Sequence, residues 1–418
     1  LVCFSGQVPT SLIGNDAFQE ADNIGLSRPC TKYNFLVKDV NDLAMTIKEA
    51  FYIAESGRPG PVLIDIPKDV SGAIIEPNYN VEIDLPGYVI PSAGDPEAIA
   101  RCAELLAAAK KPLLLIGHGA VISDAGRPLK ALAEKLQIPI VNTLLGKGAF
   151  PETHELSLGM LGMHGTAYAN MAVAECDLIM SVGSRWDDRI TGKLAAFCPN
   201  AVKIHVDIDP AEIGKMIKPH CAIVGDARLV LEELLPLARK GDTGEWISHL
   251  KKLKKRFPLH YRMHGGLKAQ YVLDELFRLT KGKAIVTTDV GQHQMWAAQF
   301  YKTDHRFHWI SSGGAGTMGF GMPAAIGAQF ARPDAQVIAV VGDGGFQMTQ
   351  AELATAAVNK LPIKILVINN RYLGMVRQWQ NLFFDNRLSG VDLEGNPDFV
   401  KLAEAYGMQG FRIKRNAD

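Results

Sequence analysis

The chain has 418 residues, a length that exceeds one hydrophobic core and predicts two or three domains. Lysine plus arginine and aspartate plus glutamate both number 44, so the net charge is zero and no nucleic-acid or acidic partner is indicated. The apolar runs are too short to span a membrane, which predicts a soluble, cytoplasmic protein.

The first region, residues 1–72, ends in a predicted strand at residues 62–66 that proline and glycine flank. Residues 73–94 are rich in proline, glycine, asparagine and acidic residues without a helical period, which predicts a linker. Asp95 followed by Pro96 is typical of a helix start, with Asp95 as the capping residue.

The middle region, residues 95–237, alternates predicted helices and strands and is interpreted as a parallel α/β domain. Its strands are expected at residues 113–116, 138–142, 178–182 and 203–207, and its first helices at 96–109 and 124–136. Residues 238–264 are expected to form a connector with a basic amphipathic helix that faces solvent.

The third region, residues 265–418, is predicted to hold a strand at 284–289 and helices at 294–300 and 322–331. Residues 411–415 resemble the start of a further strand, and the chain begins at Leu1 without a signal sequence. We therefore expect an internal segment whose first and last domains are incomplete. The six cysteines show no CxxC spacing, which favours reduced thiols in the core.

Two strings in this third region each close an apolar run. Gly342-Asp343-Gly344 follows residues 337–341, Asn369-Asn370 follows residues 363–368, and a helix is expected at residues 349–359 between the two runs. A strand, a helix and a strand of this length predict one βαβ unit, so both strand ends should lie at the same edge of a parallel sheet.

Asp343 and the Asn370 amide oxygen are the hard ligands that Mg²⁺ prefers, and Mg²⁺ commonly shares its shell with phosphate oxygens. Gly344 and Gly345 would let a diphosphate approach the backbone closely. Each string alone is explained as well by a tight turn or a loop start. The spaced pair favours a Mg²⁺-diphosphate site.

Two further glycine-rich stretches are ambiguous. Residues 314–319 fit a dinucleotide GxGxxG, but a wall packed against a flat cofactor is the favoured interpretation. Gly117-His118-Gly119 follows a predicted strand, as a nucleotide phosphate turn does. Residues 185–189 also follow a strand, and their arginines could bind a carboxylate or form surface ion pairs.

These motifs, with others, resemble the catalytic large subunit of acetohydroxyacid synthase (acetolactate synthase), a family of thiamin-diphosphate enzymes. The similarity extends from end to end of the chain. The matching strings are Gly6-Gln7-Val8-Pro9-Thr10, Asp16-Ala17-Phe18-Gln19-Glu20, Arg58-Pro59-Gly60-Pro61-Val62, Leu161-Gly162-Met163-His164-Gly165, Asp187-Asp188-Arg189-Ile190-Thr191-Gly192, Asp207-Ile208-Asp209-Pro210, Gly316-Thr317-Met318-Gly319 and Gly374-Met375-Val376-Arg377-Gln378-Trp379.

The resemblance implies an α/β fold with a pyrimidine-binding domain (1–72), a middle domain that holds FAD (95–237) and a diphosphate-binding domain (265–418). It also implies that pyruvate is decarboxylated on thiamin diphosphate and joined to a second pyruvate or 2-ketobutyrate for branched-chain amino acid biosynthesis. Active sites of this family lie between two subunits, which implies a homodimer or homotetramer, and a small regulatory subunit is a possible partner.

Site residues are implied by the same resemblance, motif by motif. Asp343, Asn370 and the Tyr372 carbonyl would bind Mg²⁺. Phe18, Gln19 and Lys68 would reach the active site from the partner subunit, Arg189 and Trp379 would bind the second keto acid, and Met318 would keep the cofactor bent. Around the cofactor the resemblance places Gly291, Gln292, His293, Gly316, Gly344, Gly345 and Met375.

The flavin site is carried over in the same way. The residues implied for FAD are Gly117, Gly119, Met163, His164, Gly165, Arg185, Asp207, Asp209 and Asp226. His118 departs from the run of three glycines familiar at this turn. The family's activating glutamate is expected upstream of Gly6, and residues 1–5 do not contain it.

Two alternatives remain open from the sequence alone. A related carboligase or pyruvate oxidase would share the cofactor motifs, although the Asp188-Arg189 and Gln378-Trp379 pairs argue against it. An inactive fragment that only binds cofactor is the other alternative.

Overall fold

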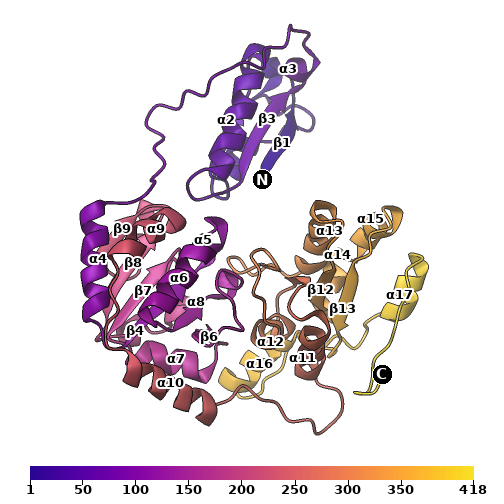
Figure 1. The fold of residues 1–418 in the computed structure, drawn as a ribbon. Helices are drawn as coiled ribbons and strands as arrows, with labels where there is room; N and C mark the ends of the chain where they lie inside the picture. The colour runs from indigo at the N-terminus through magenta and orange to yellow at the C-terminus, as the bar shows by residue number, and fades with distance from the viewer. The chain divides into compact units, whose positions relative to one another are not determined.

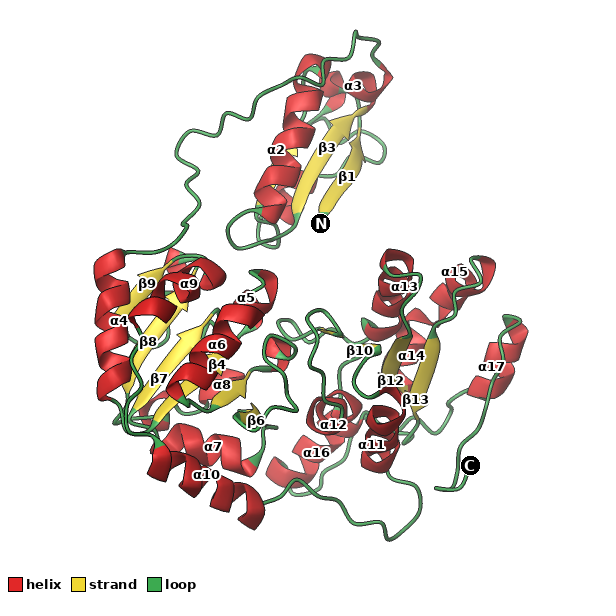
Figure 2. Ribbon diagram, in the orientation of Figure 1, coloured by secondary structure: helices red, strands yellow, loops and turns green.

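The computed structural model describes residues 1–418, and the chain divides into two compact units, Leu1–Ser92 and Ala93–Asp418 (Figure 1). All paired strands within its three sheets run parallel, and helices cover the sheets (Figure 2). No helix combines the length and apolarity that a membrane crossing would need.

The first unit holds a three-stranded sheet in the order β1-β3-β2. Its elements are β1 (Val2–Gln7), α1 (Asn23–Ser27), β2 (Tyr33–Leu36), α2 (Leu43–Glu55), β3 (Val62–Pro67) and α3 (Lys68–Gly72). Helix α2 packs on the sheet because Ala50, Ile53 and Ala54 recur on one helical face and meet Val62 and Ile64 of β3.

The second unit begins with a six-stranded sheet in the order β6-β5-β4-β7-β8-β9. Its strands are β4 (Pro112–Ile116), β5 (Ile140–Asn142), β6 (Ser157–Met160), β7 (Leu178–Val182), β8 (Val202–Asp207) and β9 (Cys221–Val224). Its helices are α4 (Pro96–Ala108), α5 (His118–Ile122), α6 (Gly126–Leu136), α7 (Ala167–Glu175), α8 (Asp188–Thr191), α9 (Ala227–Leu237) and α10 (Gly244–Arg256).

Both faces of this sheet are buried, so the central strands β4 and β7 are apolar along almost their whole length, with Ser181 of β7 as the exception. Strand β8 instead alternates apolar residues with the buried polar side chains of Lys203, His205 and Asp207. Leu114 and Ile116 of β4 face the core that α4, α6 and α9 build, whereas Leu113 and Leu115 face the core under α7 and α10. The predicted start of α4 is confirmed, because the Asp95 side chain accepts a hydrogen bond from the amide of Ala98.

A four-stranded sheet in the order β11-β10-β12-β13 completes the second unit. Its strands are β10 (Ile285–Thr288), β11 (Trp309–Ser311), β12 (Val337–Gly342) and β13 (Lys364–Ile368). Its helices are α11 (Ala269–Thr280), α12 (Gln292–Phe300), α13 (Gly321–Ala331), α14 (Asp343–Thr349), α15 (Leu353–Val358), α16 (Gly374–Phe383) and α17 (Phe399–Ala405).

Three expectations from the sequence were wrong. The helix expected at residues 349–359 is shorter, α15 at Leu353–Val358, and a separate helix, α14, begins directly at Asp343 and buries Phe346 in the core. Residues 411–415 form no strand, since no neighbouring strand pairs with them and Phe411 is 81% exposed. Four cysteines are buried as expected, but Cys3 and Cys30 are exposed.

A buried ion pair joins the two sheets of the second unit. The Lys147 ammonium donates to both carboxylate oxygens of Glu152 at 2.7 Å and to the carbonyls of Ala298 at 3.0 Å and Tyr301 at 3.1 Å. It also lies 5.0 Å from the centroid of the Trp309 ring. The lysine side chain is fully buried, and its ammonium group finds hydrogen-bond acceptors on both sides. It therefore fixes the segment after β5 to the end of α12.

We predict that Lys147→Ala lowers the free energy of unfolding by about 3 kcal/mol, because it leaves the Glu152 carboxylate buried without its cation. Urea titration followed by circular dichroism measures this loss. The control is Lys130→Ala, which removes an exposed pair to Glu134 and should cost about 0.5 kcal/mol or less. Equal losses in the two variants would contradict the prediction.

Candidate functional site

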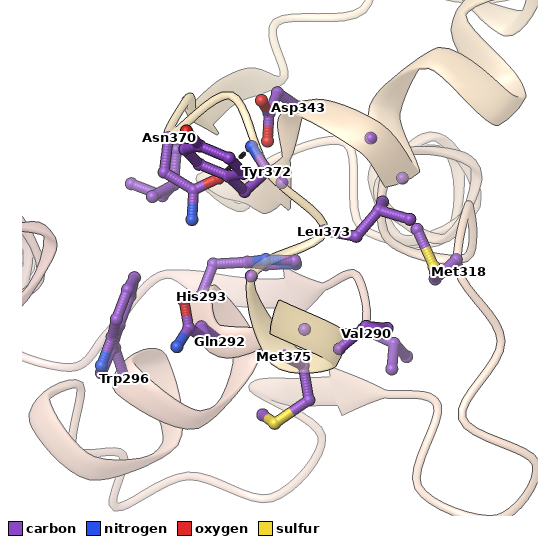
Figure 3. Close-up of a pocket in the computed structure, with 17 residues that line it drawn as sticks. Val290, Gln292, His293, Trp296, Met318, Asp343, Asn370, Tyr372, Leu373 and Met375 are labelled. Atoms are coloured by element: carbon purple, nitrogen blue, oxygen red, sulfur yellow. Dashed lines mark hydrogen bonds between the residues drawn. The ribbon is translucent and has the colours of Figure 1, made fainter. Parts of the chain in front are cut away.

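A cleft lies at the carboxyl edge of the four-stranded sheet (Figure 3). Segments that follow β10, β12 and β13 line it, together with Met318 from the turn before α13. The lining residues are Val290, Gly291, Gln292, His293, Trp296, Met318, Gly342, Asp343, Gly344, Gly345, Ile368, Asn370, Tyr372, Leu373, Gly374, Met375 and Val376.

The pairing of the strands explains why these segments meet. Gly342 at the end of β12 pairs with Ile368 at the end of β13, and Thr288 of β10 pairs with Val340 of β12. Because the strands are parallel, every residue that follows them emerges at one edge. The prediction that the GDG and Asn-Asn strings share this edge is therefore confirmed.

Asp343 is the first residue of α14 and is only 2% exposed. Its Oδ2 accepts hydrogen bonds from the Arg371 amide at 2.8 Å and from the Asn396 side chain at 2.7 Å. Burial raises the pKa of the Asp343 carboxyl, and these two hydrogen bonds oppose that rise. A carboxylate so placed fits a divalent cation, because a cation would offset the cost of burying the negative charge.

The Asn370 side chain lies beside Asp343 and Tyr372 in the cleft (Figure 3). Its Oδ1 accepts a hydrogen bond from the Tyr372 amide at 3.0 Å, which turns the backbone directly after β13. The three predicted metal-binding residues are thus brought together as one carboxylate, one amide and one backbone carbonyl, all with hard oxygen donors.

The glycines of the cleft are required by neighbouring protein groups as well as by any ligand. A Cβ on Gly342 would lie 2.7 Å from the His293 ring, and a Cβ on Gly345 would lie 2.0 Å from Asp289 Oδ2. On Gly344 it would meet only the ends of flexible side chains, the nearest that of Leu373 at 2.7 Å. Of these three positions, Gly344 alone is enclosed by groups that can move aside.

His293 is buried behind the two glycine segments, and its Nε2 has no hydrogen-bond partner. Burial lowers the pKa of His293 to about 4, so the imidazole is neutral at pH 7. An orphaned polar atom in a cleft wall fits a polar ligand, because the bond it lacks within the protein could be made to a bound group.

Of the remaining predicted residues of this site, Gly291, Gln292, Met318 and Met375 line the cleft. Gly316 and Trp379 do not. Gly316, with a φ of 67°, shapes the turn that carries Met318. Trp379 lies further along α16, 37% exposed, with its ring 5.2 Å from that of Phe383.

Sequence reasoning missed part of the lining. The lining residues to which it gave no individual role in the site are Val290, Trp296, Gly342, Leu373, Gly374, Val376 and Ile368. Most of them adjoin a motif that it did name, so proximity along the chain was the available signal. Trp296 is the exception, because it joins the wall through one turn of α12. Asn396 was also missed, since 53 residues separate it from the Asp343 carboxylate it binds.

The residues predicted for a flavin lie at the carboxyl edge of the six-stranded sheet. The Gly119 amide donates to the Gly183 carbonyl at 3.0 Å, and a Cβ on Gly117 would lie 2.1 Å from the same oxygen. The turn after β4 therefore packs backbone to backbone against the turn after β7. His118 donates from Nδ1 to the Leu145 carbonyl, 3.0 Å away.

Two other segments predicted for the flavin also meet. The Met163 amide donates to the Arg189 carbonyl at 3.0 Å, and the Gln299 side chain of α12 donates to the His164 carbonyl at 2.8 Å. Burial and the Arg189 charge lower the pKa of His164. Arg185 pairs with Asp187 at 3.5 Å. This edge is thereby tied to the helix that lines the cleft.

The acidic residues predicted for the flavin include two helix caps. Asp226 Oδ1 accepts from the amides of Arg228 and Leu229 at the start of α9, and Asp209 Oδ1 accepts from the Ala211 amide. Asp207 Oδ1 accepts from the Asp209 amide at 3.0 Å. Capping accounts for the presence of Asp226 and Asp209 whatever else they bind.

In the first unit, Phe18 and Gln19 lie in the loop that follows β1, and Lys68 begins α3 directly after β3. Strands β1 and β3 are parallel neighbours, so both segments belong to one sheet edge. The Thr10 hydroxyl donates to Asp69 at 2.5 Å, which ties this loop to α3. Phe18 is 89% exposed.

Two family models match the chain. The central domain of thiamine pyrophosphate enzymes matches residues 99–234, and the C-terminal TPP-binding domain of these enzymes matches residues 289–418. The second match contains every residue that lines the cleft. The fold and the site thus define a thiamine pyrophosphate enzyme.

Curated relatives are similar over nearly the whole chain. The acetolactate synthase isozyme 3 large subunit of Escherichia coli is 47% identical over 423 residues, which are 99% of this chain and 74% of that protein. The acetolactate synthase large subunit of Corynebacterium glutamicum is 48% identical (99% and 68%), and the probable one of Methanocaldococcus jannaschii is 48% identical (99% and 72%). The chain belongs to the acetolactate synthase large subunit family.

We predict that Gly345→Ala destabilises the protein, although alanine is favoured by roughly 1 kcal/mol over glycine in a helix interior. The added Cβ would meet the buried Asp289 carboxylate at 2.0 Å. The control is Gly327→Ala in α13, where a Cβ meets nothing within 4 Å and a small gain is expected. Thermal denaturation compares the two, and a gain in both would contradict the prediction.

Proposed function

We propose that this chain makes 2-acetolactate from two molecules of pyruvate with release of CO₂, and 2-aceto-2-hydroxybutyrate when 2-ketobutyrate is the second substrate. This would place it in branched-chain amino acid biosynthesis. The observation that carries the proposal is the cleft that gathers the Gly291-Gln292-His293, Gly342 to Gly345 and Asn370 to Tyr372 segments at one sheet edge. Family membership at 47% identity supports the same reaction.

Thiamin diphosphate, when bound, supplies the carbon nucleophile that adds to the keto group of pyruvate and accepts charge as CO₂ leaves. In our proposal Mg²⁺ is held by Asp343, Asn370 and the Tyr372 carbonyl, and it neutralises the diphosphate. Support comes from the buried Asp343 carboxylate, which no cationic side chain within hydrogen-bonding distance neutralises. Gly344, Gly345 and neutral His293 would then contact the phosphate groups.

We further propose that residues 95–237 bind FAD as a structural cofactor and that residues 265–418 bind the diphosphate. The close backbone packing of Gly117 and Gly119 against Gly183 supports the flavin site, because it leaves a turn with no side chain except that of His118 at a sheet edge. The Gln299 to His164 hydrogen bond would connect the two cofactor sites.

Substrate selection is proposed to involve Arg189 and Trp379, and Phe18, Gln19 and Lys68 are proposed to act from a partner subunit of a homodimer or larger assembly. Arg189 is well exposed and pairs only loosely with Asp188, at 3.6 Å, so its guanidinium could bind a carboxylate. The name of the relatives, large subunit, is compatible with a small regulatory partner.

The direct test measures acetolactate formation from pyruvate with thiamin diphosphate, Mg²⁺ and FAD, together with oxygen consumption. We expect acetolactate without oxygen consumption, and we expect Asp343→Ala to lower Mg²⁺-dependent cofactor affinity by at least about 100-fold because a charged ligand is lost.

The matched control is Asp334→Ala, which removes an exposed carboxylate near Arg332 and should leave affinity and rate unchanged. Oxygen uptake coupled to pyruvate would favour an oxidase instead. Absence of acetolactate from a protein that binds both cofactors would refute the proposed reaction.

A second prediction concerns the choice of the second keto acid. Trp379→Ala should reduce the preference for 2-ketobutyrate over pyruvate by about 10-fold or more, because a lost apolar contact with one methylene is worth about 1–3 kcal/mol. Competition between the two acids, with both products quantified, measures the ratio. Phe383→Ala removes the ring that packs on Trp379 and serves as comparison: a smaller shift is expected.

A further inference from the structure

Asp289 is a buried acid that lies directly behind the cleft without lining it. It follows the last residue of β10, and its side chain is fully buried. The segments around it all contribute to the lining: Val290 is its neighbour in sequence, Met318 ends the glycine-rich turn, and Gly345 belongs to α14. The proposed reaction and metal site make no use of this carboxyl.

One oxygen of Asp289 holds two of these segments. Oδ1 accepts hydrogen bonds of 2.7 Å from the Val290 amide and 2.7 Å from the Gly319 amide. The Gly319 amide directly follows Met318, so the carboxylate fixes the peptide that carries the Met318 side chain into the cleft. The Asp289 amide donates to the Val340 carbonyl at 3.0 Å, which anchors the carboxylate to the sheet.

The other carboxylate oxygen of Asp289, Oδ2, lies next to Gly345 of α14. Oδ2 has no hydrogen-bond partner, and the position of a Cβ on Gly345 is only 2.0 Å away. Burial raises the pKa of the Asp289 carboxyl, and the bonds from Val290 and Gly319 oppose that rise. A strand end needs no such group, because a serine or asparagine would accept the same bonds without a buried carboxyl.

The Met318 turn has a second anchor on its far side. The Thr349 hydroxyl of α14 donates to the Gly319 carbonyl at 3.0 Å, and the Thr317 amide donates to Ser312 Oγ at 3.0 Å. Loss of the Asp289 bond would therefore leave the turn folded but free to tilt. Gly319 has a φ of 89°, so its backbone conformation depends on glycine rather than on a side chain.

We propose that Asp289 is a positioning residue that fixes Met318 relative to the Gly342 to Gly345 segment, and thereby fixes the angle between the two rings of the bound cofactor. This inference rests on the proposed function, because Met318 is taken to contact thiamin diphosphate. Asp289 itself touches neither cofactor nor substrate in this proposal. It acts through the Gly319 amide.

The test compares Asp289→Asn and Asp289→Ala with Thr287→Val in the whole protein loaded with Mg²⁺ and thiamin diphosphate. Thr287 Oγ1 donates to the Gly321 carbonyl at 2.7 Å, so the control also removes a fully buried hydrogen bond from β10 but keeps the bond from the Gly319 amide to Asp289. The readouts are kcat at saturating cofactor, cofactor Kd by calorimetry, Tm, and the near-ultraviolet circular dichroism of bound cofactor, which reports the mutual orientation of its rings.

We expect Asp289→Ala to lower kcat at saturating cofactor by about 100-fold, the scale of a misplacement by about 1 Å, and to alter the circular dichroism band. Asp289→Asn keeps an acceptor for the Gly319 amide and the shape of the side chain, so it should fold and lose much less. Thr287→Val should lower Tm while kcat and the dichroism band stay as in the wild type.

A wild-type kcat and dichroism band in Asp289→Ala would overturn the proposal, and so would a loss that saturating cofactor restores. If Asp289→Ala fails to fold, Asp289→Leu decides, because leucine fills nearly the same space but offers no acceptor to the Gly319 amide: a dichroism band and kcat identical to wild type at all cofactor concentrations overturn the proposal. Failure of the proposed function is distinguishable, because then the wild type itself would bind no cofactor and form no acetolactate, and this inference would fall with it.

Discussion

The site depends on one constraint, the parallel register of β10, β12 and β13. Gly342 pairs with Ile368, so Asp343 and the residues just after β13 emerge side by side although they are far apart in the chain. Hydrogen bonds then fix the side chains that the register places at this edge. The Arg371 amide and the Asn396 side chain, for example, both donate to Asp343 Oδ2. A slip of this pairing by one residue would separate the proposed ligands and turn the strand faces over.

The two sheets of the second unit are held together by polar groups that lie close to functional segments. Lys147 binds the end of α12, whose first turn lines the cleft, and Arg306 donates to the carbonyls of Val121 and Ile122 at the end of α5. Satisfied buried polar groups specify one arrangement where apolar contact alone would tolerate several. The flavin-type edge and the cleft therefore have a defined mutual geometry.

Features that local pattern determines could be predicted from the sequence. Strand 178–182 and the cap at Asp95 were correct, because apolar runs and capping residues act within a few positions. The start of α14 at Asp343 was missed, because its first three residues include two glycines, which disfavour a helix locally, whereas Phe346 of the same helix is buried by residues distant in sequence. Long-range bonds such as Asn396 to Asp343, and the burial of Asp289 behind the wall, leave no signature in spacing. That Trp379 does not line the cleft likewise depends on the orientation of α16 within the domain, which local sequence does not encode.

The glycines of the cleft have a consequence for how such motifs change over evolutionary time. Gly342 and Gly345 are closed to any side chain by His293 and Asp289, so substitution there is opposed by the fold even when no ligand is bound. Gly344 meets only flexible side-chain ends such as that of Leu373, and its retention would depend on the ligand alone. In a descendant that had lost catalysis, the outer glycines would persist and the central one would drift first. The residue at the position of Gly344 therefore best distinguishes a catalytically active homologue from an inactive one.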